Sequence, residues 1–329
     1  MSDLKVGILG ASKIAGRPTV PAMTAVDGVV PVTVAARDPQ RAAAFAQEHG
    51  LGVSESYDAV VRDPDVDVVY VPLPNGLHYE WVRAALLAGK HVLSEKSLTG
   101  SLEQSRELIE LARTRQLVLV ENFMCETHPQ HAVARVLVAD GRVGTLRHLD
   151  LSFGFPPFPA DDQRNSAELD GGALNDAGAY CAFMARHYAG RMPVSVSTIA
   201  DQGSYDVDVV GSTHLDFGGG LTASLTYGFQ HDYRNEVRLW GSGGQLLIDR
   251  AFSIPKDRTP SLTLTSNTVA TPIEAAPADQ FDLQIKRFRD LVTTGEGREA
   301  EYNKALEHAA TMEAMRVSGR LGGARVRPD

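Results

Sequence analysis

The sequence has few cysteines, no long apolar run and no excess of positive charge. Its 329 residues include two cysteines, Cys125 and Cys181, which are too few for a disulfide framework and favour a reducing compartment. No stretch approaches the roughly 18 apolar residues of a membrane span. The start, MSDLKVGILG, leads straight into a strand-like stretch, so we expect no signal peptide. These absences predict a cytoplasmic globular protein.

Acidic residues outnumber basic ones, with 41 Asp and Glu against 32 Lys and Arg, which gives a formal net charge of -9. This balance argues against a protein that coats nucleic acid, although one local basic pocket remains compatible with it. Cys-x-x-Cys and His-Glu-x-x-His patterns are missing, so a zinc site is not expected. Gly-x-Ser-x-Gly is missing too, which argues against a hydrolase of that type. We therefore expect no metal, no nucleic acid and no membrane partner.

Short apolar runs alternate with amphipathic stretches as far as residue 122. The expected strands are residues 4–9, 32–36, 66–71, 91–94 and 117–121. The expected helices are residues 14–25, 39–49, 77–88 and 101–115. Strands that alternate with helices of about 10–15 residues indicate βαβ units and a parallel sheet. Residues 1–122 are therefore predicted to form a Rossmann-type α/β domain.

The pattern changes after residue 122, where 17 of the 22 aromatic residues are found. Helices are expected at residues 129–139, 172–189, 279–292 and 299–318. Strands are expected at residues 146–153, 194–200, 207–217, 221–229, 236–240 and 245–249. Consecutive strands joined by glycine-rich turns indicate a mainly antiparallel sheet. Residues 123–329 are therefore predicted to form an α+β domain with one large open sheet, which binds substrate and pairs subunits.

The first strand is followed by a glycine-rich turn that opens a helix, which is the context of a dinucleotide fingerprint. The pattern G-x-G-x-x-G/A is present as Gly10, Ser12 and Ala15, so serine replaces the second glycine. The free N–H groups at the helix start are expected to face a pyrophosphate. A plain βα turn is the alternative. The residues expected to bind cofactor here are Gly10, Ala11, Ser12, Lys13 and Ile14.

The end of the second strand favours NADP over NAD. NAD sites place an acidic residue there for the ribose hydroxyls, but Ala36 fills that place and Arg37 follows it. A guanidinium can pair with a 2′-phosphate and stack on adenine. Asp38 is expected to cap the next helix instead. The alternative is that Arg37 is a solvated surface charge.

Two later loops and one helix carry further candidates. Lys96 follows the fourth strand, where it could donate to a carbonyl oxygen, or it could be an ordinary surface lysine. His78 starts a helix and could merely cap it. Asp176 and Tyr180 are spaced i, i+4, so they share a helix face that points away from the apolar stripe. A tyrosine beside a lysine ammonium can pass a proton to a ketone, whereas the plainer alternative is an exposed tyrosine with a capping aspartate.

Together these motifs resemble the Gfo/Idh/MocA family of NAD(P)-dependent oxidoreductases along essentially the whole chain. The stretches that carry the resemblance are VGILGASKIA, PLPNGLHYEW, HVLSEKSL, ENFMCETHPQH and GGALNDAGAY. Lys96 stands where the family has the lysine of its EKP motif, with Ser97 in place of the proline. Some members carry a catalytic histidine on the later helix, but Tyr180 is similar to the tyrosine of the dihydrodiol, xylose and sugar-ketoreductase branch.

Within that branch, SFGFPPFPADDQR and HDYRNEVRLWGSGGQLLIDRAF most resemble NDP-hexose 3-ketoreductases of deoxysugar pathways. The resemblance implies NADPH, a nucleotide-linked deoxy-keto-sugar with dTDP as carrier, and dimers or tetramers formed through the open sheets. It also implies that Asn122 and Arg164 lie near the nicotinamide. The further residues implied to bind cofactor are Leu73, Pro74, Asn75, His78, Glu95 and Lys96.

The resulting hypothesis is hydride transfer to the 3-keto carbon, with Lys96 and Tyr180 bonded to the carbonyl oxygen. Tyr180 supplies the proton, Lys96 lowers its pKa, and Asp176 orients a sugar hydroxyl or Lys96. One alternative is a sugar or dihydrodiol dehydrogenase of the same family. An alternative of another class is a non-catalytic NADP-binding sensor or repressor, against which the joint presence of Lys96 and Tyr180 argues.

Overall fold

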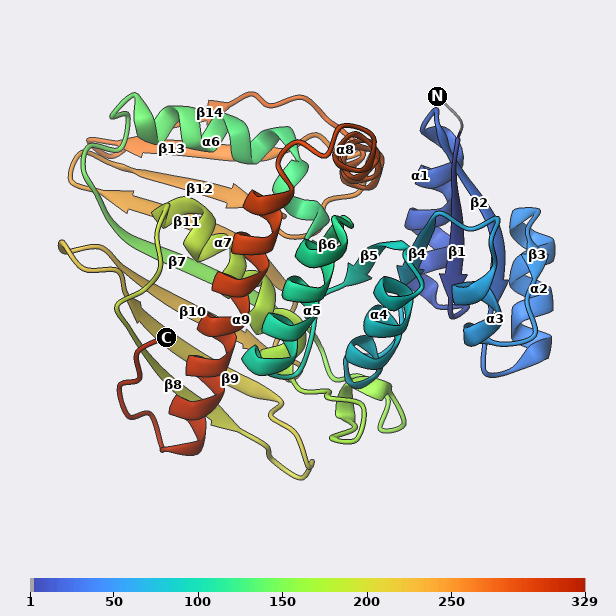
Figure 1. Ribbon diagram of the computed structural model, residues 1–329. Helices are drawn as coiled ribbons and strands as arrows, with labels where there is room; N and C mark the ends of the chain where they lie inside the picture. Colours follow the sequence, from blue (N-terminus) through green and yellow to red (C-terminus); the bar gives the residue numbers. More distant parts are fainter. Residues whose placement is uncertain (1–2, 329) are drawn as a thin grey trace. The chain divides into compact units, whose positions relative to one another are not determined.

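A computed structural model describes residues 3–328 (Figure 1). The chain divides into two compact units. The first comprises Met1–Met124 and Phe281–Ala309, and the second comprises Cys125–Gln280 and Ala310–Asp329. Within residues 3–328, no helix is long and apolar enough to cross a membrane.

The first unit is built on a six-stranded sheet in which every neighbouring pair is parallel. Its strands are β1 Leu4–Leu9, β2 Val29–Ala35, β3 Gly52–Val53, β4 Val68–Val71, β5 His91–Glu95 and β6 Leu119–Asn122. Their order is β3-β2-β1-β4-β5-β6. Parallel pairing brings the carboxyl ends of all the strands to one edge, where open α/β sheets bind their ligands. The predicted Rossmann-type sheet is confirmed.

Helices connect these strands, two later helices (α8 and α9) join them, and short polar side chains start several of the helices. The helical segments are α1 Val20–Ala25, α2 Pro39–His49, α3 Tyr57–Arg62, α4 His78–Leu87, α5 Leu102–Arg115, α8 Gln280–Thr294 and α9 Arg298–Arg320. Asp38 caps α2 as expected, since its Oδ1 accepts from the Gln40 backbone N–H at 2.9 Å. The same helix ends at Gly50, whose φ of 70° lies in the left-handed region that glycine adopts easily.

The start of the first helix is a π-helical turn, Ala15–Thr19, with a proline inside it. In a regular α-helix the N–H of residue 18 would donate to the carbonyl oxygen of Ile14, four residues earlier. Pro18 has no N–H, so this hydrogen bond cannot form. The Thr19 hydroxyl takes that place and donates to Ile14 O at 2.9 Å. The widened turn is therefore satisfied locally, directly after the predicted fingerprint.

Buried apolar side chains cover both faces of the first sheet, because alternate strand residues point to opposite faces. One cluster contains Leu9 and Val71 and is joined by Tyr302 of α9. The other contains Ile8 and is joined by Phe288 of α8. Residues 281–309 therefore complete the first unit. This differs from the expectation of two contiguous domains divided at residues 122 and 123.

The second unit is built on an eight-stranded sheet of order β14-β13-β12-β11-β7-β10-β9-β8. Its strands are β7 Leu146–Gly154, β8 Ser195–Asp201, β9 Val210–Asp216, β10 Thr222–Gly228, β11 Arg234–Gly241, β12 Gln245–Asp249, β13 Ser261–Ser266 and β14 Val269–Ile273. All neighbouring pairs are antiparallel except β7 with β10, which are parallel. The predicted large, mainly antiparallel sheet is confirmed.

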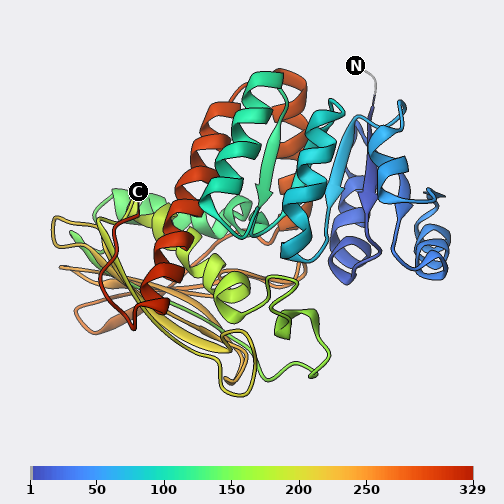
Figure 2. The same cartoon turned by 60° about the horizontal axis from the view of Figure 1, so that its bottom comes forward.

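Helices lie on one face of this second sheet. The unit contains α6 Pro129–Ala139 and α7 Ala179–Ala189, and it also takes the last part of α9. Figure 2 shows α7 and the end of α9 on the same face, while no helix of the described residues covers the other face. The buried Leu149, Leu151 and Phe153 of β7 point to the helical face. The other face is therefore open in this chain, as expected.

The structure contains short or polar elements that the sequence pattern did not indicate, among them β3, α3, β13 and β14. β3 has two residues, both exposed, and pairs only with the end of β2. β13 is rich in Ser and Thr, and β14 is largely exposed. Edge strands of this kind bury too few apolar groups to give a clear alternation.

Candidate functional site

The first turn has the backbone that a close approach to a phosphate requires. Gly10 has a φ of 108°, which strains any larger residue, and a Cβ there would lie 3.0 Å from Leu73 Cδ2, so the leucine side chain would have to shift. Ser12 Oγ accepts from the Ala15 N–H at 3.3 Å, so the serine that replaces the second glycine caps the turn. The segment from Gly10 to Ile14 thus lies at the carboxyl end of β1, as predicted.

The end of β2 presents a cation beside this turn. Arg37 is exposed, and its guanidinium makes no hydrogen bond or ion pair with residues 3–328. Arg41 lies in the first turn of α2, and its Nη2 donates to Ala11 O at 3.0 Å. The sequence pattern does not indicate Arg41, because Arg37 precedes α2 and the two residues share no helix face.

A buried carboxyl group lies at the end of β5. Glu95 Oε1 accepts from the Tyr70 hydroxyl at 2.8 Å and from Asn122 Nδ2 at 2.7 Å. Burial raises the pKa of Glu95, and the two hydrogen bonds oppose that rise. Thr19 Oγ1, which donates its own proton to Ile14 O, lies 3.2 Å from the Tyr70 hydroxyl oxygen, whose single proton goes to Glu95. Glu95 thus links three strands to the first helix.

Two loops at this edge are joined through His78. Its ring is buried, with Nδ1 2.8 Å from Ser97 O and Nε2 2.8 Å from Leu73 O. Carbonyl oxygens only accept, so a neutral imidazole donates to one of them and contacts the other. His78 therefore connects the segment containing Pro74 and Asn75 to the loop that follows Lys96, and the helix-cap alternative does not describe its contacts.

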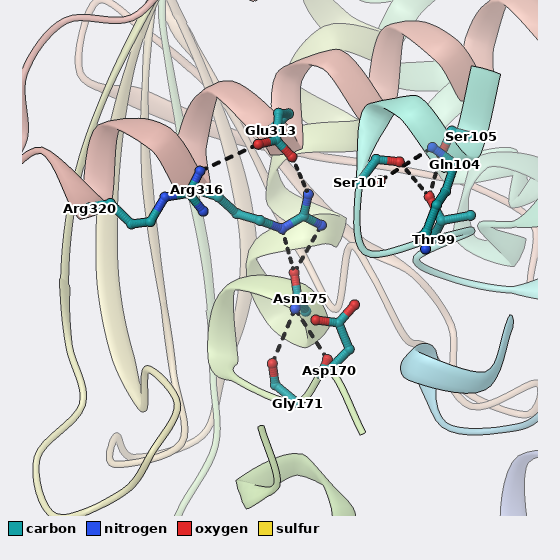
Figure 3. Close-up of polar contacts among 10 residues, drawn as sticks. All are labelled: Thr99, Ser101, Gln104, Ser105, Asp170, Gly171, Asn175, Glu313, Arg316 and Arg320. Atoms are coloured by element: carbon teal, nitrogen blue, oxygen red, sulfur yellow. Dashed lines mark hydrogen bonds and ion pairs between the residues drawn. The ribbon is translucent and has the colours of Figure 1, made fainter. Parts of the chain in front are cut away.

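Lys96 is half-buried directly after Glu95, and its positive charge lowers the pKa of that carboxyl group against the effect of burial. The chain beyond it is tied down. Leu98 N donates to Glu121 Oε1 at 2.8 Å. Figure 3 shows the next turn, where Ser101 Oγ accepts from the Gln104 N–H at 3.2 Å to start α5. The lysine is thus placed by fixed backbone on both sides.

The first unit offers matching groups for a nicotinamide dinucleotide. Asn122 Oδ1 is buried and has no hydrogen-bond partner within residues 3–328, so it can accept from a carboxamide. The helix start after Gly10 suits a pyrophosphate, and Arg37 suits a 2′-phosphate. The residues present therefore fit the cofactor that the sequence predicts.

In the second unit, Asp176 belongs to a π-helical turn, Leu174–Gly178, and Tyr180 to α7. Arg164 Nε donates to Asp176 Oδ2 at 2.7 Å, and its Nη1 donates to Asp162 Oδ1 at 3.1 Å. Tyr180 is 7% exposed and packs edge-on against Phe153, with 5.5 Å between the ring centroids. The expectation that Tyr180 points away from the apolar side is wrong, because nearly every residue of α7 is buried.

The segment that carries Asp176 is anchored from two sides that the sequence analysis missed. Figure 3 shows Arg316 of α9 donating to Asn175 Oδ1 at 3.1 and 3.2 Å, while Asn175 Nδ2 donates to Asp170 O and Gly171 O at 3.1 Å each. Arg316 also pairs with Glu313 at 3.4 Å. No local motif indicates these contacts, since 141 residues separate Asn175 from Arg316.

The second anchor is Asp208, which lies just before β9. Its Oδ2 accepts from the Leu174 N–H at 2.7 Å, and its carbonyl oxygen accepts from the Ala173 N–H at 2.8 Å. Burial raises the pKa of Asp208 to about 6, although the bond from Leu174 opposes the rise. A Cβ at Gly172 would collide with Asp208 Oδ1, so glycine is required where the carboxyl group caps the helix.

The predicted site residues therefore fall into two groups. The first-unit group lies at the carboxyl ends of β1, β2, β4, β5 and β6. The second-unit group is Arg164, Asp176 and Tyr180. Arg164, expected near the nicotinamide, is paired with two carboxylates of its own unit. Each group is ordered by contacts within its own unit.

The comparisons with known proteins agree with this arrangement. A family model described as "Oxidoreductase family, NAD-binding Rossmann fold" matches residues 4–123, and the "GFO/IDH/MocA C-terminal domain" matches residues 131–247. A dTDP-3,4-didehydro-2,6-dideoxy-alpha-D-glucose 3-reductase of Streptomyces antibioticus is 38% identical over 320 residues, covering 97% of this chain and 98% of that protein. The enzyme of the same name from Saccharopolyspora spinosa is 36% identical over 326 residues, with 97% and 98% covered.

A solved structure extends the likeness to three dimensions. The 3-ketoreductase of Actinomadura kijaniata in complex with NADP and TDP-benzene is similar with a TM-score of 0.93 and 36% identity. The match covers 96% of this chain and 98% of that one. The resemblance expected from the motifs is confirmed: the chain belongs to the Gfo/Idh/MocA family of oxidoreductases.

Proposed function

We propose that this protein reduces the 3-keto group of a nucleotide-linked deoxy-keto-hexose, with NADPH as the reductant and dTDP as the carrier. The observation that carries the proposal is the similarity along nearly the whole chain to dTDP-sugar 3-reductases, one relative having been solved with NADP and TDP-benzene. The unpaired Arg37 at the end of β2 supports the phosphorylated cofactor.

The first unit holds the cofactor through the carboxyl ends of its strands. The turn after Gly10 binds the pyrophosphate, Arg37 the 2′-phosphate, and Asn122 Oδ1 the carboxamide. NADPH supplies the hydride that forms the new C–H bond at the ketone carbon. Tyr70 keeps the buried Glu95 hydrogen-bonded, and His78 holds the two loops that border the nicotinamide half of the site.

Lys96 and Tyr180 are the proposed catalytic residues. Both bond the carbonyl oxygen, and their hydrogen bonds stabilise the negative charge that develops there. Tyr180 gives its phenolic proton to that oxygen, and the Lys96 ammonium stabilises the phenolate that remains until solvent returns the proton. Asp176, fixed by Arg164, orients a hydroxyl group of the sugar.

A turnover assay with NADPH and a dTDP-linked 3-keto-sugar tests these roles. Lys96→Ala should lower kcat by at least about 100-fold, the usual scale for a group that assists proton transfer, and should leave NADPH binding intact. Tyr180→Phe should behave similarly. The exposed Lys286→Ala serves as the control. Near-normal turnover of Lys96→Ala would contradict the catalytic role of this lysine. A wild-type protein that reduces only free pyranoses would contradict the proposed substrate.

The proposed setting is the cytoplasm, and the proposed assembly is a homodimer or homotetramer formed through the open sheet. Both cysteines are free and buried. On the helix-free face of the sheet, Trp240 and Ile199 are each 59% exposed. Large apolar side chains exposed in this way are typical of a surface that another subunit covers. Molar mass by light scattering, well above 35.4 kDa, is the expected result.

A further inference from the structure

Several strand ends meet at one end of the second sheet. The register pairs Gly154 of β7 with Arg234 of β11 and with Gly228 of β10. In the next strand, Asp249 of β12 lies opposite Glu236. The residues just beyond these ends, among them Phe155, Tyr233 and Arg250, therefore belong to one edge of the unit.

Aromatic rings connect this edge to Tyr180. Ring centroids are 5.5 Å apart for Tyr180 and Phe153, 4.6 Å for Phe153 and Phe155, and 5.5 Å for Phe155 and Tyr233. Phe252 packs on the same group, 4.8 Å from Phe153. A continuous row of rings thus runs from the proposed proton donor to Tyr233.

A cation lies at the far end of the row. The Arg250 guanidinium lies over the Tyr233 ring, with its carbon 4.5 Å from the centroid. It makes no hydrogen bond or ion pair with residues 3–328. The backbone of Arg250 is nevertheless fixed, because its N–H donates to Asn235 O at 2.7 Å and its carbonyl oxygen accepts from Gln130 Nε2 at 3.2 Å.

The φ of Arg250 is 57°, a left-handed value that is unfavourable for a residue with a long side chain. Such strain persists where the surrounding structure imposes it, and it concentrates at functional sites. Here it places an unpaired guanidinium on an aromatic face at the same end of the sheet as Tyr180.

Neighbouring arginines at this end differ, since each has a carboxylate partner. Arg164 pairs with Asp176 and Asp162. Arg234 pairs with Glu236 at 2.8 Å, and Arg258 pairs with Asp249 at 3.1 Å. Asp249, the residue before Arg250, is therefore already neutralised by another arginine. The positive charge of Arg250 is available for an anionic ligand, because no described residue neutralises it.

We propose that Arg250 binds the diphosphate of the nucleotide-linked sugar, with Tyr233 as the platform that holds its guanidinium. The proposal rests on the function proposed above. The reacting C3 carbonyl and the C1 diphosphate belong to the same substrate molecule, so a group that binds the diphosphate is required at the same end of the second unit as Tyr180. Phe153 and Phe252 are buried, so the packed rings between the two residues fix the position of Tyr233 relative to Tyr180.

The test measures dTDP binding by calorimetry in the presence of saturating NADPH. Arg250→Met removes the charge but keeps a side chain over Tyr233, and it should weaken dTDP binding about 10–100-fold, the effect of losing charge-assisted hydrogen bonds. Thymidine, which has no phosphate, should bind both proteins equally. Arg250→Lys should restore part of the affinity, and Arg147→Met, at an exposed arginine at the other end of β7, should bind dTDP as the wild type does.

Kinetics give a second readout. Arg250→Met should raise KM for the nucleotide sugar with kcat within about threefold of wild type, because the interaction is equal in the ground and transition states. If wild type binds dTDP and Arg250→Met binds it within twofold, this assignment is overturned and the proposed function stands. A wild-type protein that binds no dTDP overturns both. The thermal midpoint of each variant checks that it is folded. Tyr233→Leu removes the aromatic ring under the Arg250 guanidinium, and it should weaken dTDP binding as Arg250→Met does.

Discussion

At the scale of single residues, the cofactor preference depends on one exposed side chain. Arg37 follows Ala36 at the end of β2, where an acidic residue would select NAD. Arg37→Ala should therefore weaken NADPH binding about 10-fold or more and leave NADH binding within about twofold, because the lost contact is a charge-assisted bond to the 2′-phosphate. Dissociation constants of both cofactors, measured by protein fluorescence, check this. An unchanged preference would show that Arg37 is only a surface charge.

Asp208 predicts a specific pH dependence of stability. Its pKa is raised from 3.8 to about 6 in the folded state, so the folded state binds the proton more tightly than the unfolded state does. This contribution is fully present below pH 3.8 and is lost as the pH rises through about 6. Asp208→Asn, which keeps an acceptor for the Leu174 N–H, should therefore gain stability relative to wild type between about pH 4 and pH 7, by about 2–3 kcal/mol.

Urea unfolding of both proteins at pH 4, 5, 6 and 7 measures the difference. A constant difference across these pH values would contradict the raised pKa of Asp208. Glu313→Gln is a suitable comparison, because this carboxylate is partly exposed and pairs with Arg316 and Arg320.

The candidate residues at strand ends can be predicted from the sequence, but the residues that position them cannot. Gly10, Arg37 and Lys96 follow recognisable strands, so their place at the ligand edge could be predicted. Asp208 and Arg316 reach the Asp176 segment from distant parts of the chain, and only the folded topology reveals such contacts. Tyr180 was assigned by its spacing, but its burial among aromatic rings was missed because an α-helix that is apolar on all sides has no distinct polar face.

At the scale of secondary structure, the alternation of strands and helices predicted the parallel sheet, whereas two features needed three-dimensional packing. One is the parallel pairing of β7 with β10, which consecutive strands do not suggest. The other is the return of residues 281–309 to the first unit. Helical periodicity identified α8 and the start of α9, but periodicity alone does not say which sheet an apolar face covers.

The role of α8 in the first unit can be tested by one truncation. Phe288 is 3% exposed within the apolar cluster that contains Ile8, so Phe288→Ala should lower the free energy of unfolding by about 3–5 kcal/mol. Lys286→Ala, at an exposed position of the same helix, should change it by less than about 0.5 kcal/mol. Thermal and urea unfolding provide both values. A loss below about 1 kcal/mol for Phe288→Ala would mean that α8 adds little to the first unit.

At the scale of the whole molecule, a chain of net charge -9 is proposed to bind two anionic molecules, NADPH and a nucleotide diphosphate sugar. The overall field does not attract them. Binding instead relies on placed groups: the helix start after Gly10, Arg37, Lys96 and the unpaired Arg250. Most other arginines near the proposed sites are paired with carboxylates, which keeps the available positive charge local.

Transfer of deuterium from [4-²H]NADPH of the reactive face to a dTDP-linked 3-keto-deoxyhexose tests the central claim most directly. NMR of the product identifies the carbon that receives the label. We expect deuterium at C3 of the sugar with wild type, and incorporation slowed at least about 100-fold with Lys96→Ala. Deuterium at another carbon, or none in the sugar while NADPH is bound, would contradict this claim.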